Sequence, residues 1–361
     1  MKITFILPHA GHNPIGGFKV AYEYANGLAQ KGHEVTAVHA PICYYGDSRP
    51  LLSARNLFVF CGRMLGLKGG FRPSQWFRMD DRVKMLWAPS LDQRWIPPAD
   101  AVIATAWNTA EWVGSYPAEK GSKYYLIQHQ ESLFPNTDQS RAMATWKLPL
   151  RKIVIARWLE EIATGLGEES AYIPNGLDFD AFGLDIPLLE RDPCRLIMLY
   201  HNDDWKGSRD GLAAMFIAKK EIPGLTATLF GVPARPDGLP DWIDYVRMPA
   251  QRELRRIYNE AAIFISPSWA EGWPLPPAEA AQCGAALCIT DIGGHREYAV
   301  AGETALLSPP KDPEALARTI LSLVKDSELR TRLAKCSHDF IQRFTWDLAI
   351  QRMEKYVQEN R

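Results

Sequence analysis

Residues 262–298 constrain the fold most, because an apolar run, a glycine loop, a helix start and a second apolar run follow one another closely there. The run from Ala262 to Ser266 is typical of a buried strand. Pro276 and Pro277 predict the first turn of a helix, where proline breaks no intrahelical hydrogen bond, and Gly284 predicts its end. Strands that alternate with helices in this way predict βαβ units and an α/β fold with parallel sheets.

Two glutamates flank the predicted helix start, Glu271 in the loop and Glu279 in the first turn of the helix. The free N–H groups of a helix that starts at the carboxyl end of a parallel sheet favour a phosphate. A carboxylate beside a phosphate site can accept hydrogen bonds from sugar hydroxyls, as the acidic residue of dinucleotide folds does with ribose. Either glutamate alone would be read as a solvated loop charge or a helix-capping carboxylate. A carboxylate such as Glu279 beside such a phosphate site points to a nucleotide.

The segment E-G-W-P-L-P-P-A-E, from Glu271 to Glu279, resembles the E-x7-E region of retaining glycosyltransferases of family 4. Proteins of that family have the GT-B fold, two Rossmann-like domains whose parallel sheets face a central cleft. The resemblance implies that Glu271 contacts the donor sugar and Glu279 the nucleotide ribose. It also implies that Gly272, Leu275 and Pro276 line the nucleotide-sugar site.

The amino terminus also resembles the GT-B opening. An apolar strand from Ile3 to Leu7 precedes a loop with Gly11, Gly16 and Gly17, and a helical pattern runs from Phe18 to Gln30. A glycine pair alone is weak evidence, since turns use glycine everywhere. The resemblance implies that Gly16 and Gly17 face the donor diphosphate.

His129 follows the predicted strand that begins at Lys123. An isolated histidine in such a place is as often structural as functional, but the carboxyl ends of strands are where open α/β sheets bind ligands. In the family a histidine at the comparable place touches the donor sugar near the reacting centre, which implies a catalytic role for His129. The residues around it, Gln-His-Gln-Glu, depart from the commoner His-Asp pattern.

Lys206 and Gly207 lie in a strand-to-helix loop of the second half of the chain. Lysine there gives a compact cation for a phosphate, or is an ordinary exposed side chain. The family has G-R-x(3–4)-K-G at this place, so the resemblance implies that Lys206 binds the diphosphate and stabilises the leaving group. No arginine precedes it at that spacing, and His201, which stands nearest, is the candidate nucleotide-sugar ligand there. Arg209 or Arg296 could supply the second cation.

The length of 361 residues predicts two domains, at about 150 residues each, and 47% hydrophobic residues suffice for two cores. We place the first domain at 1–182 and the second at 195–344, with a final helix over 345–361 that returns to the first domain. Asp178-Phe179-Asp180 is formally a D-x-D metal pattern, but it follows Asn175-Gly176 and is interpreted as turn chemistry. We therefore expect no metal and no cofactor besides the nucleoside diphosphate sugar.

The net charge of −1 argues against nucleic acid as a partner. The chain starts without a signal-peptide pattern, and its cysteines lack C-x-x-C pairing, which predicts a cytoplasmic protein. Two segments, 55–84 and 141–158, mix basic and aromatic residues. They are either solvated or core segments, or surfaces for a lipid-linked acceptor and for peripheral contact with the inner face of a membrane.

Together these features predict a metal-independent retaining glycosyltransferase of polysaccharide biosynthesis. It would move a hexosyl or deoxyhexosyl group from a nucleotide sugar, bound by the second domain, to a glycan, lipid-linked or small-molecule acceptor on the first. Two alternatives remain: a nucleotide-sugar epimerase on the same fold, and a non-catalytic nucleotide-sugar or glycan-binding subunit. The joint presence of Glu271, Lys206 and His129 favours an enzyme.

Overall fold

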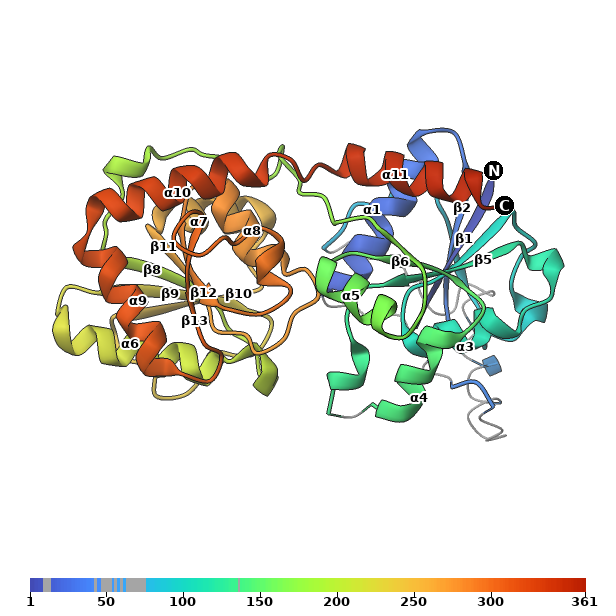
Figure 1. Cartoon of the computed structure of the whole chain (residues 1–361), viewed down its shortest axis with the longest axis horizontal. Coiled ribbons are helices and arrows are strands. Elements are labelled where there is room, and N and C mark those ends of the chain that lie inside the picture. The colour runs from blue at the N-terminus through green and yellow to red at the C-terminus, as the bar shows by residue number, and fades with distance from the viewer. Residues whose placement is uncertain are drawn as a thin grey trace. The chain divides into compact units, whose positions relative to one another are not determined.

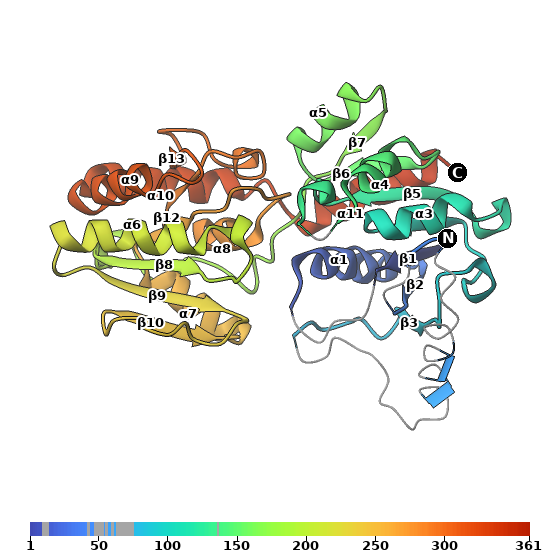
Figure 2. The same ribbon diagram turned by 90° about the horizontal axis from the view of Figure 1, so that it is seen from below.

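The computed structural model describes residues 1–8, 14–41, 44–46, 54, 57–58, 61–62, 76–135 and 137–361. The chain divides into two compact units. Unit 1 comprises Met1–Asn175 and Trp346–Arg361, and unit 2 comprises Gly176–Thr345. Each unit is a parallel sheet covered by helices, so the predicted α/β class is confirmed (Figures 1 and 2).

The sheet of unit 1 has seven strands in the order β3-β2-β1-β4-β5-β6-β7, and every pairing is parallel. Its strands are β1 (Lys2–Leu7), β2 (Glu34–His39), β3 (Lys84–Trp87), β4 (Ala101–Ala104), β5 (Ser122–Ile127), β6 (Arg151–Val154) and β7 (Ser170–Tyr172). The chain runs outward from β1 to β3 and then outward on the other side from β4 to β7. The strand order therefore reverses between β1 and β4, and open α/β sheets bind ligands beyond the carboxyl ends of the strands at such a reversal.

The last helix of the chain belongs to the core of unit 1. The helices of this unit whose bounds the described residues define include α1 (Gly16–Gln30), α3 (Trp107–Ser115), α4 (Gln139–Ala144), α5 (Arg157–Gly165) and α11 (Trp346–Glu359). The Ile350 side chain lies so close to Gly27 that a Cβ at Gly27 would clash with it. The rings of Tyr24 and Trp346 meet edge to face with their centroids 5.5 Å apart. Helix α11 thus packs on α1 (Figure 1).

The sheet of unit 2 has six parallel strands in the order β10-β9-β8-β11-β12-β13, and it reverses between β8 and β11. Its strands are β8 (Arg195–Leu199), β9 (Thr226–Gly231), β10 (Ile243–Arg247), β11 (Ile263–Ser266), β12 (Ala286–Thr290) and β13 (Ala305–Ser308). Its helices are α6 (Ser208–Glu221), α7 (Gln251–Glu260), α8 (Leu275–Gln282), α9 (Pro313–Lys325) and α10 (Ser327–Ile341). Helix α6 packs beside α9, and α10 packs against α8 and β12 (Figure 2).

The central strands of unit 2 contain continuous apolar runs because both faces of the sheet are covered. Ile263 and Ile265 of β11 and Leu196 and Met198 of β8 are all fully buried. Continuous apolar strands are typical of parallel sheets with helices on both sides. The prediction of a buried strand over 262–266 is confirmed, with β11 beginning one residue later.

The boundary between the units falls after Asn175, and residues 176–194 pack with unit 2. Arg191 fixes this segment, since its guanidinium donates to the carbonyls of Ile186, at 3.2 and 3.0 Å, of Ala261, at 3.1 Å, and of Cys283. Asp178 caps a turn, as its carboxylate accepts from the N–H of Asp180 at 3.1 Å and of Ala181 at 2.8 Å. That geometry agrees with the interpretation of D-x-D as turn chemistry.

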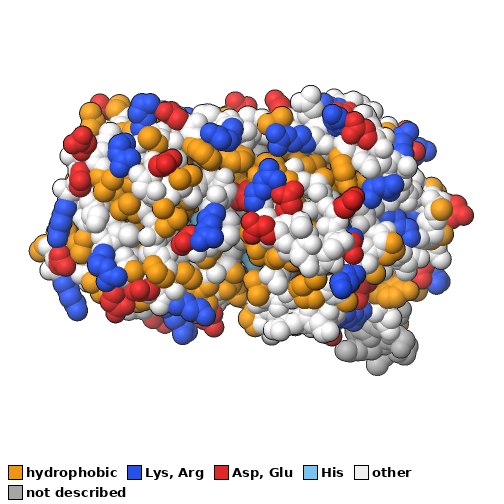
Figure 3. Space-filling model, viewed as in Figure 1, with side chains coloured by type: hydrophobic (Ala, Val, Ile, Leu, Met, Phe, Trp, Pro, Cys, Tyr) orange, Lys and Arg blue, Asp and Glu red, His pale blue; other side chains and the backbone are white. Residues whose placement is uncertain are grey.

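Basic and acidic side chains alternate over the face of the molecule seen in Figure 3, without a large patch of one sign. Most of segment 55–84 lies outside the described residues. In segment 141–158, Trp146 and Leu150 are core residues, and Lys152 pairs with Glu168 at 2.5 Å. Within the described parts of the chain, no helix is long and apolar enough to cross a membrane. Peripheral membrane contact stays a prediction.

Candidate active site

The contact between Lys206 and Glu271 is the main feature at the carboxyl edge of the second sheet. The Lys206 ammonium lies 2.8 Å from Oε1 and 2.9 Å from Oε2 of Glu271. The Ser268 hydroxyl donates to Oε1 at 2.9 Å. Glu271 is only 9% exposed, whereas about a quarter of the Lys206 side chain is accessible (24%). A cation and an anion separated by 65 residues in sequence thus share one position between the β8 and β11 loops.

Gly207 makes this contact possible. The 3-10 turn Asp204–Lys206 ends at Gly207, whose φ of +63° lies in the left-handed region. A Cβ at Gly207 would clash with the carbonyl oxygen of Pro267, so only glycine lets the two loops come this close. The backbone N–H of Trp269 also donates to the backbone carbonyl of Trp205 at 2.7 Å. This hydrogen bond links the loop after β11 to the turn that carries Lys206.

Gly294 brings a third loop against Glu271. Gly294 follows β12, and a Cβ there would clash with the carbonyl oxygen of Glu271. The sequence prediction did not include Gly294. The only signal for it was the Gly-Gly pair that directly follows a predicted strand.

A buried histidine, His295, belongs to a hydrogen-bond network that holds the loop that carries Glu271. The Ser266 hydroxyl lies 3.0 Å from its Nε2, and its Nδ1 lies 2.7 Å from the Thr290 carbonyl. The Thr290 hydroxyl in turn donates to the Ser268 carbonyl at 2.5 Å. Burial lowers the pKa of His295 to about 4, so the ring is neutral at pH 7. Sequence analysis missed this network because its members are spread over three segments.

Glu279 lies one residue deeper in α8 than predicted. Helix α8 begins at Leu275, so Glu279 is its fifth residue, and the prediction of a first-turn position is wrong. The helix starts before the proline pair because the buried Tyr298 hydroxyl donates to the Pro274 carbonyl at 2.8 Å and fixes the entry. Glu279 is 6% exposed and accepts a hydrogen bond of 3.4 Å from the Tyr258 hydroxyl. Burial and the Glu279 carboxylate raise the pKa of Tyr258 well above its ordinary value, so Tyr258 remains a donor.

The other predicted residues of α8 and its loop lie at the same sheet edge. Gly272 is buried, while Leu275 and Pro276 at the start of the helix are partly exposed. The predicted end of the helix is confirmed, since α8 stops at Gln282 and Gly284 has a φ of +86°.

His201 lies at the end of β8 and acts as an acceptor in its own loop. The Nδ1 of its ring accepts from the backbone N–H of Asp203 at 3.1 Å, and the backbone N–H of His201 donates to the Ser208 hydroxyl at 2.8 Å. Burial lowers the pKa of His201, although the Asp203 carboxylate acts in the opposite direction. Of the two arginines considered as additional cations, Arg296 binds Asp291 at 2.6 and 2.9 Å, and Arg209 is exposed on α6.

Gly16 and Gly17 are the first two residues of α1, so the prediction that they lie in the preceding loop is wrong. The N–H groups of Phe18 and Lys19 already donate to the Ile15 carbonyl, which starts the helix at Gly16. The Gln128 side chain donates to the Gly17 carbonyl at 3.1 Å and links this helix start to the end of β5. The loop glycine Gly11 lies outside the described residues.

His129 follows β5 in unit 1 and is half-buried between aromatic rings. Its ring centroid lies 4.8 Å from that of Phe134 and 5.8 Å from that of Trp158. The structure thus places His129 and the two glycines at the carboxyl edge of the first sheet. It places Lys206, His201, Glu271 and Glu279 at the carboxyl edge of the second.

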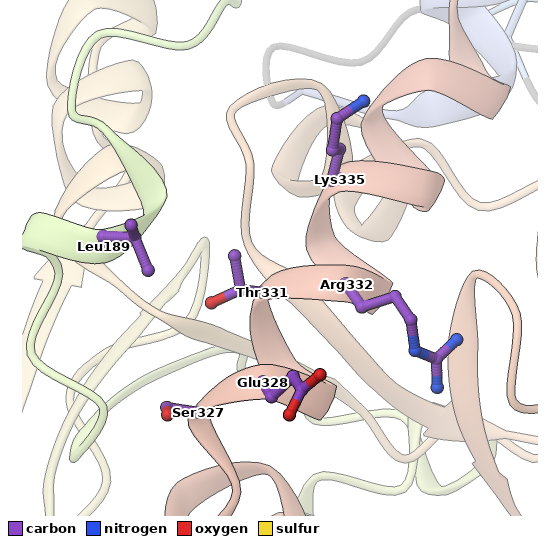
Figure 4. Close-up of a pocket in the computed structure, with 6 residues that line it drawn as sticks. All are labelled: Leu189, Ser327, Glu328, Thr331, Arg332 and Lys335. Carbon is purple, nitrogen blue, oxygen red and sulfur yellow. The ribbon is translucent and has the colours of Figure 1, made fainter.

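The described residues also form an open hollow of roughly 430 Å³ beside α10, far from these side chains in sequence (Figure 4). Leu189 faces it from the segment before β8, and its other lining residues all belong to α10: Ser327, Glu328, Thr331, Arg332 and Lys335. It contains none of the predicted site residues. No group of three or more His, Cys, Asp or Glu side chains within the described residues could hold a metal ion.

Solved structures with the same architecture include sucrose-phosphate synthase from Thermosynechococcus elongatus, with a TM-score of 0.71 and 17% identity over 99% of this chain and 98% of that one. HepE of Anabaena, solved with UDP and glucose, also has a TM-score of 0.71, with 15% identity over 99% of this chain and all of the other (100%). The fold is GT-B.

Within the GT-B fold, residues 241–338 match the model of the family "Glycosyl transferases group 1". This region runs from just before β10 to α10 and includes Glu271, Gly272 and Glu279, but not Lys206 or His201. Among curated proteins, the O-antigen biosynthesis protein RfbC of Myxococcus xanthus is 26% identical over 76% of this chain and 22% of its own length. Glycogen synthase of Mycobacterium tuberculosis is 28% identical over 53% of this chain and 48% of its own length. The chain thus spans less than half the length of these relatives.

Proposed function

We propose that this protein is a retaining glycosyltransferase of the family 4 type. It would transfer a hexosyl or deoxyhexosyl group from a nucleoside diphosphate sugar to a glycan, lipid-linked or small-molecule acceptor. The observation that carries the proposal is the contact of Lys206 with both carboxylate oxygens of Glu271, at 2.8 and 2.9 Å.

Two charges in direct contact can reach only neighbouring groups of one ligand. In a nucleotide sugar, the diphosphate and the sugar are directly bonded, so an ammonium for the phosphate and a carboxylate for the sugar hydroxyls must lie side by side. Lys206 would exchange Glu271 for the diphosphate, and Glu271 would then accept from the sugar.

Departure of the nucleoside diphosphate builds negative charge at the phosphate. A fixed ammonium in a partly buried site stabilises that charge better than water does, because the dipoles around it need no reorganisation. Lys206 is held in this way by the Gly207 turn. Under this proposal the leaving group needs no metal ion.

Glu279 is the proposed ribose ligand. Its carboxylate is carried by α8 and accepts from Tyr258, and the two oxygens of a carboxylate can accept several hydrogen bonds, such as those of ribose hydroxyls. The names of the curated relatives, an O-antigen biosynthesis protein and a glycogen synthase, support a role in polysaccharide biosynthesis.

A panel of nucleotide sugars tests the proposal. We expect one or a few of them to raise the melting temperature, and the stabilising donor to be consumed in the presence of a suitable acceptor with release of the nucleoside diphosphate. Conversion of the nucleotide sugar to its epimer without an acceptor would instead identify an epimerase. Stabilisation without any turnover would identify a binding subunit.

A further inference from the structure

An aromatic cluster lies beyond the carboxyl ends of strands β2, β4 and β5 of unit 1. Tyr44 and Tyr45 follow β2, Trp107 begins α3 directly after β4, and Glu131 follows β5. In the sheet these strands flank the β1/β4 reversal, which is where open α/β sheets bind ligands. The cluster therefore occupies a ligand-binding edge, on the unit that lacks Lys206 and Glu271.

Two tyrosine rings in this cluster are accessible to solvent, and each packs on the ring of a tryptophan. Tyr44 stacks on Trp107 with centroids 5.6 Å apart and an interplanar angle of 28°, and Tyr45 meets Trp112 edge to face at 5.1 Å. Tyr44 is 37% exposed and Tyr45 is 45% exposed, whereas Trp107 below them is buried. Supported, solvent-facing rings of this kind are typical of sites that pack on a ligand.

An ion pair holds the two tyrosines in place. Arg141 of α4 donates from Nε and Nη2 to the two oxygens of Glu111 in α3, at 2.5 and 2.7 Å. Its Nη2 also donates to the Tyr45 carbonyl at 2.6 Å, and its Cζ lies 5.6 Å from the centre of the Trp107 ring. The pair is electrically balanced and about one third of the Arg141 side chain is exposed (34%).

Glu131 closes the base of the cluster. Its Oε2 accepts from the Trp107 N–H at 2.5 Å, at the start of α3. Burial raises the pKa of Glu131 to about 7, so at neutral pH this carboxyl is protonated in a substantial fraction of the molecules. With Arg141 balanced by Glu111, the side chains named here carry no excess of positive charge.

We propose that Tyr44, Tyr45 and the Arg141–Glu111 pair form the acceptor subsite, and that they bind a neutral saccharide. This proposal rests on the glycosyltransferase function proposed above. The C–H face of a sugar ring packs on an aromatic ring, while a fixed guanidinium–carboxylate pair offers both donors and acceptors to the hydroxyls. An anionic acceptor would require an excess of positive charge, which the balanced pair does not supply.

Saturation-transfer NMR with defined trisaccharides tests the subsite without any need for turnover. The probes are neutral trisaccharides of gluco, manno, galacto and N-acetylglucosamine configuration, with matched trisaccharides that contain uronic acids. We expect wild type to bind a neutral trisaccharide and Tyr45→Phe to keep that binding. Replacing both tyrosines by alanine should weaken it about tenfold or more. Phe216→Ala, which removes a 41% exposed ring from unit 2, is the matched control and should bind as wild type does.

Glu111→Gln provides an independent variant in case the double substitution perturbs folding. It leaves the charge of Arg141 unbalanced, so preference should shift from the neutral toward the uronate trisaccharides. Equal binding by wild type and the double variant, a wild-type preference for uronates, or no trisaccharide binding by wild type would each overturn the subsite. Calorimetric titration of wild type with UDP, GDP, ADP, CDP and dTDP separates the two proposals. Nucleotide binding without the expected sugar binding refutes the subsite alone, whereas loss of both refutes the proposed function.

Discussion

Removal of Glu271 should uncouple sugar transfer from nucleotide binding. In the free protein the Lys206 ammonium is bound by both oxygens of Glu271, so a diphosphate must displace that carboxylate. Two unit charges about 4 Å apart attract by about 4 kcal/mol at an effective dielectric constant near 20, and exposure of the Lys206 side chain reduces this further. Glu271→Ala removes the competitor for Lys206, so affinity for a nucleoside diphosphate should be unchanged or rise by up to about tenfold, or 1.4 kcal/mol.

Transfer should respond in the opposite direction. If Glu271 contacts the donor sugar as the glycosidic bond breaks, Glu271→Ala should lower kcat/KM by about 100-fold, which corresponds to about 2.7 kcal/mol of transition-state stabilisation. Calorimetry with the nucleoside diphosphate and steady-state transfer kinetics measure the two effects on one variant. Asp291→Asn is a suitable control, because Asp291 forms its own ion pair with Arg296 after β12 and has no proposed role.

Two results would refute this reasoning. Transfer near the wild-type rate would show that Glu271 is not in the sugar pocket. A transfer defect that is fully explained by weaker nucleotide binding would show that Glu271 supports the site only through Lys206.

Three further predictions follow from the same geometry. Glu279→Gln should weaken the binding of the donor and of the free nucleoside diphosphate alike, since both contain the ribose. Equal calorimetric affinity of wild type and variant for the nucleoside diphosphate would show that Glu279 does not bind the ribose. Transfer should survive EDTA if Lys206 supplies the positive charge at the diphosphate as proposed, and loss of activity that manganese or magnesium restores would contradict this. His295 should make unfolding pH-dependent, since its pKa of about 4 in the fold lies below its ordinary 6.5. The contribution of His295 to the free energy of unfolding is full above pH 6.5 and is lost as the pH falls toward 4, because the unfolded state binds the proton more tightly. The free energy of unfolding should therefore drop by about 2 kcal/mol from pH 7.5 to pH 5. Urea unfolding of His295→Gln should lack this component, and an identical pH dependence in wild type and variant would argue against a buried neutral ring.

The elements that were predicted, such as the strand over 262–266 and the helix that ends before Gly284, have local signals. The apolar run that became β11 and the glycine that ends α8 act within a few residues of themselves. Exact helix starts were less predictable, since they depend on distant partners. Helix α8 begins at Leu275 because Tyr298 holds Pro274, which moves Glu279 out of the first turn.

The site itself was predictable only in part. Resemblance to a known family pointed to Lys206 and Glu271 separately, but their contact joins two loops that are far apart in sequence. Gly294 and His295 were missed because their roles arise from close packing against the Glu271 loop, which no local pattern records. The same holds for Tyr44 on Trp107, where the segment after β2 supplies one ring and the start of α3 supplies the other.

The configuration of the product tests the central claim most directly. The protein is incubated with the nucleotide sugar that stabilises it and an acceptor, and the new linkage is examined by NMR. We predict that wild type forms a glycoside with the same anomeric configuration as the donor. The rate of transfer should fall at least about 100-fold in Lys206→Ala, which corresponds to about 2.7 kcal/mol of transition-state stabilisation. An inverted linkage, or transfer by Lys206→Ala at the wild-type rate, would contradict the account.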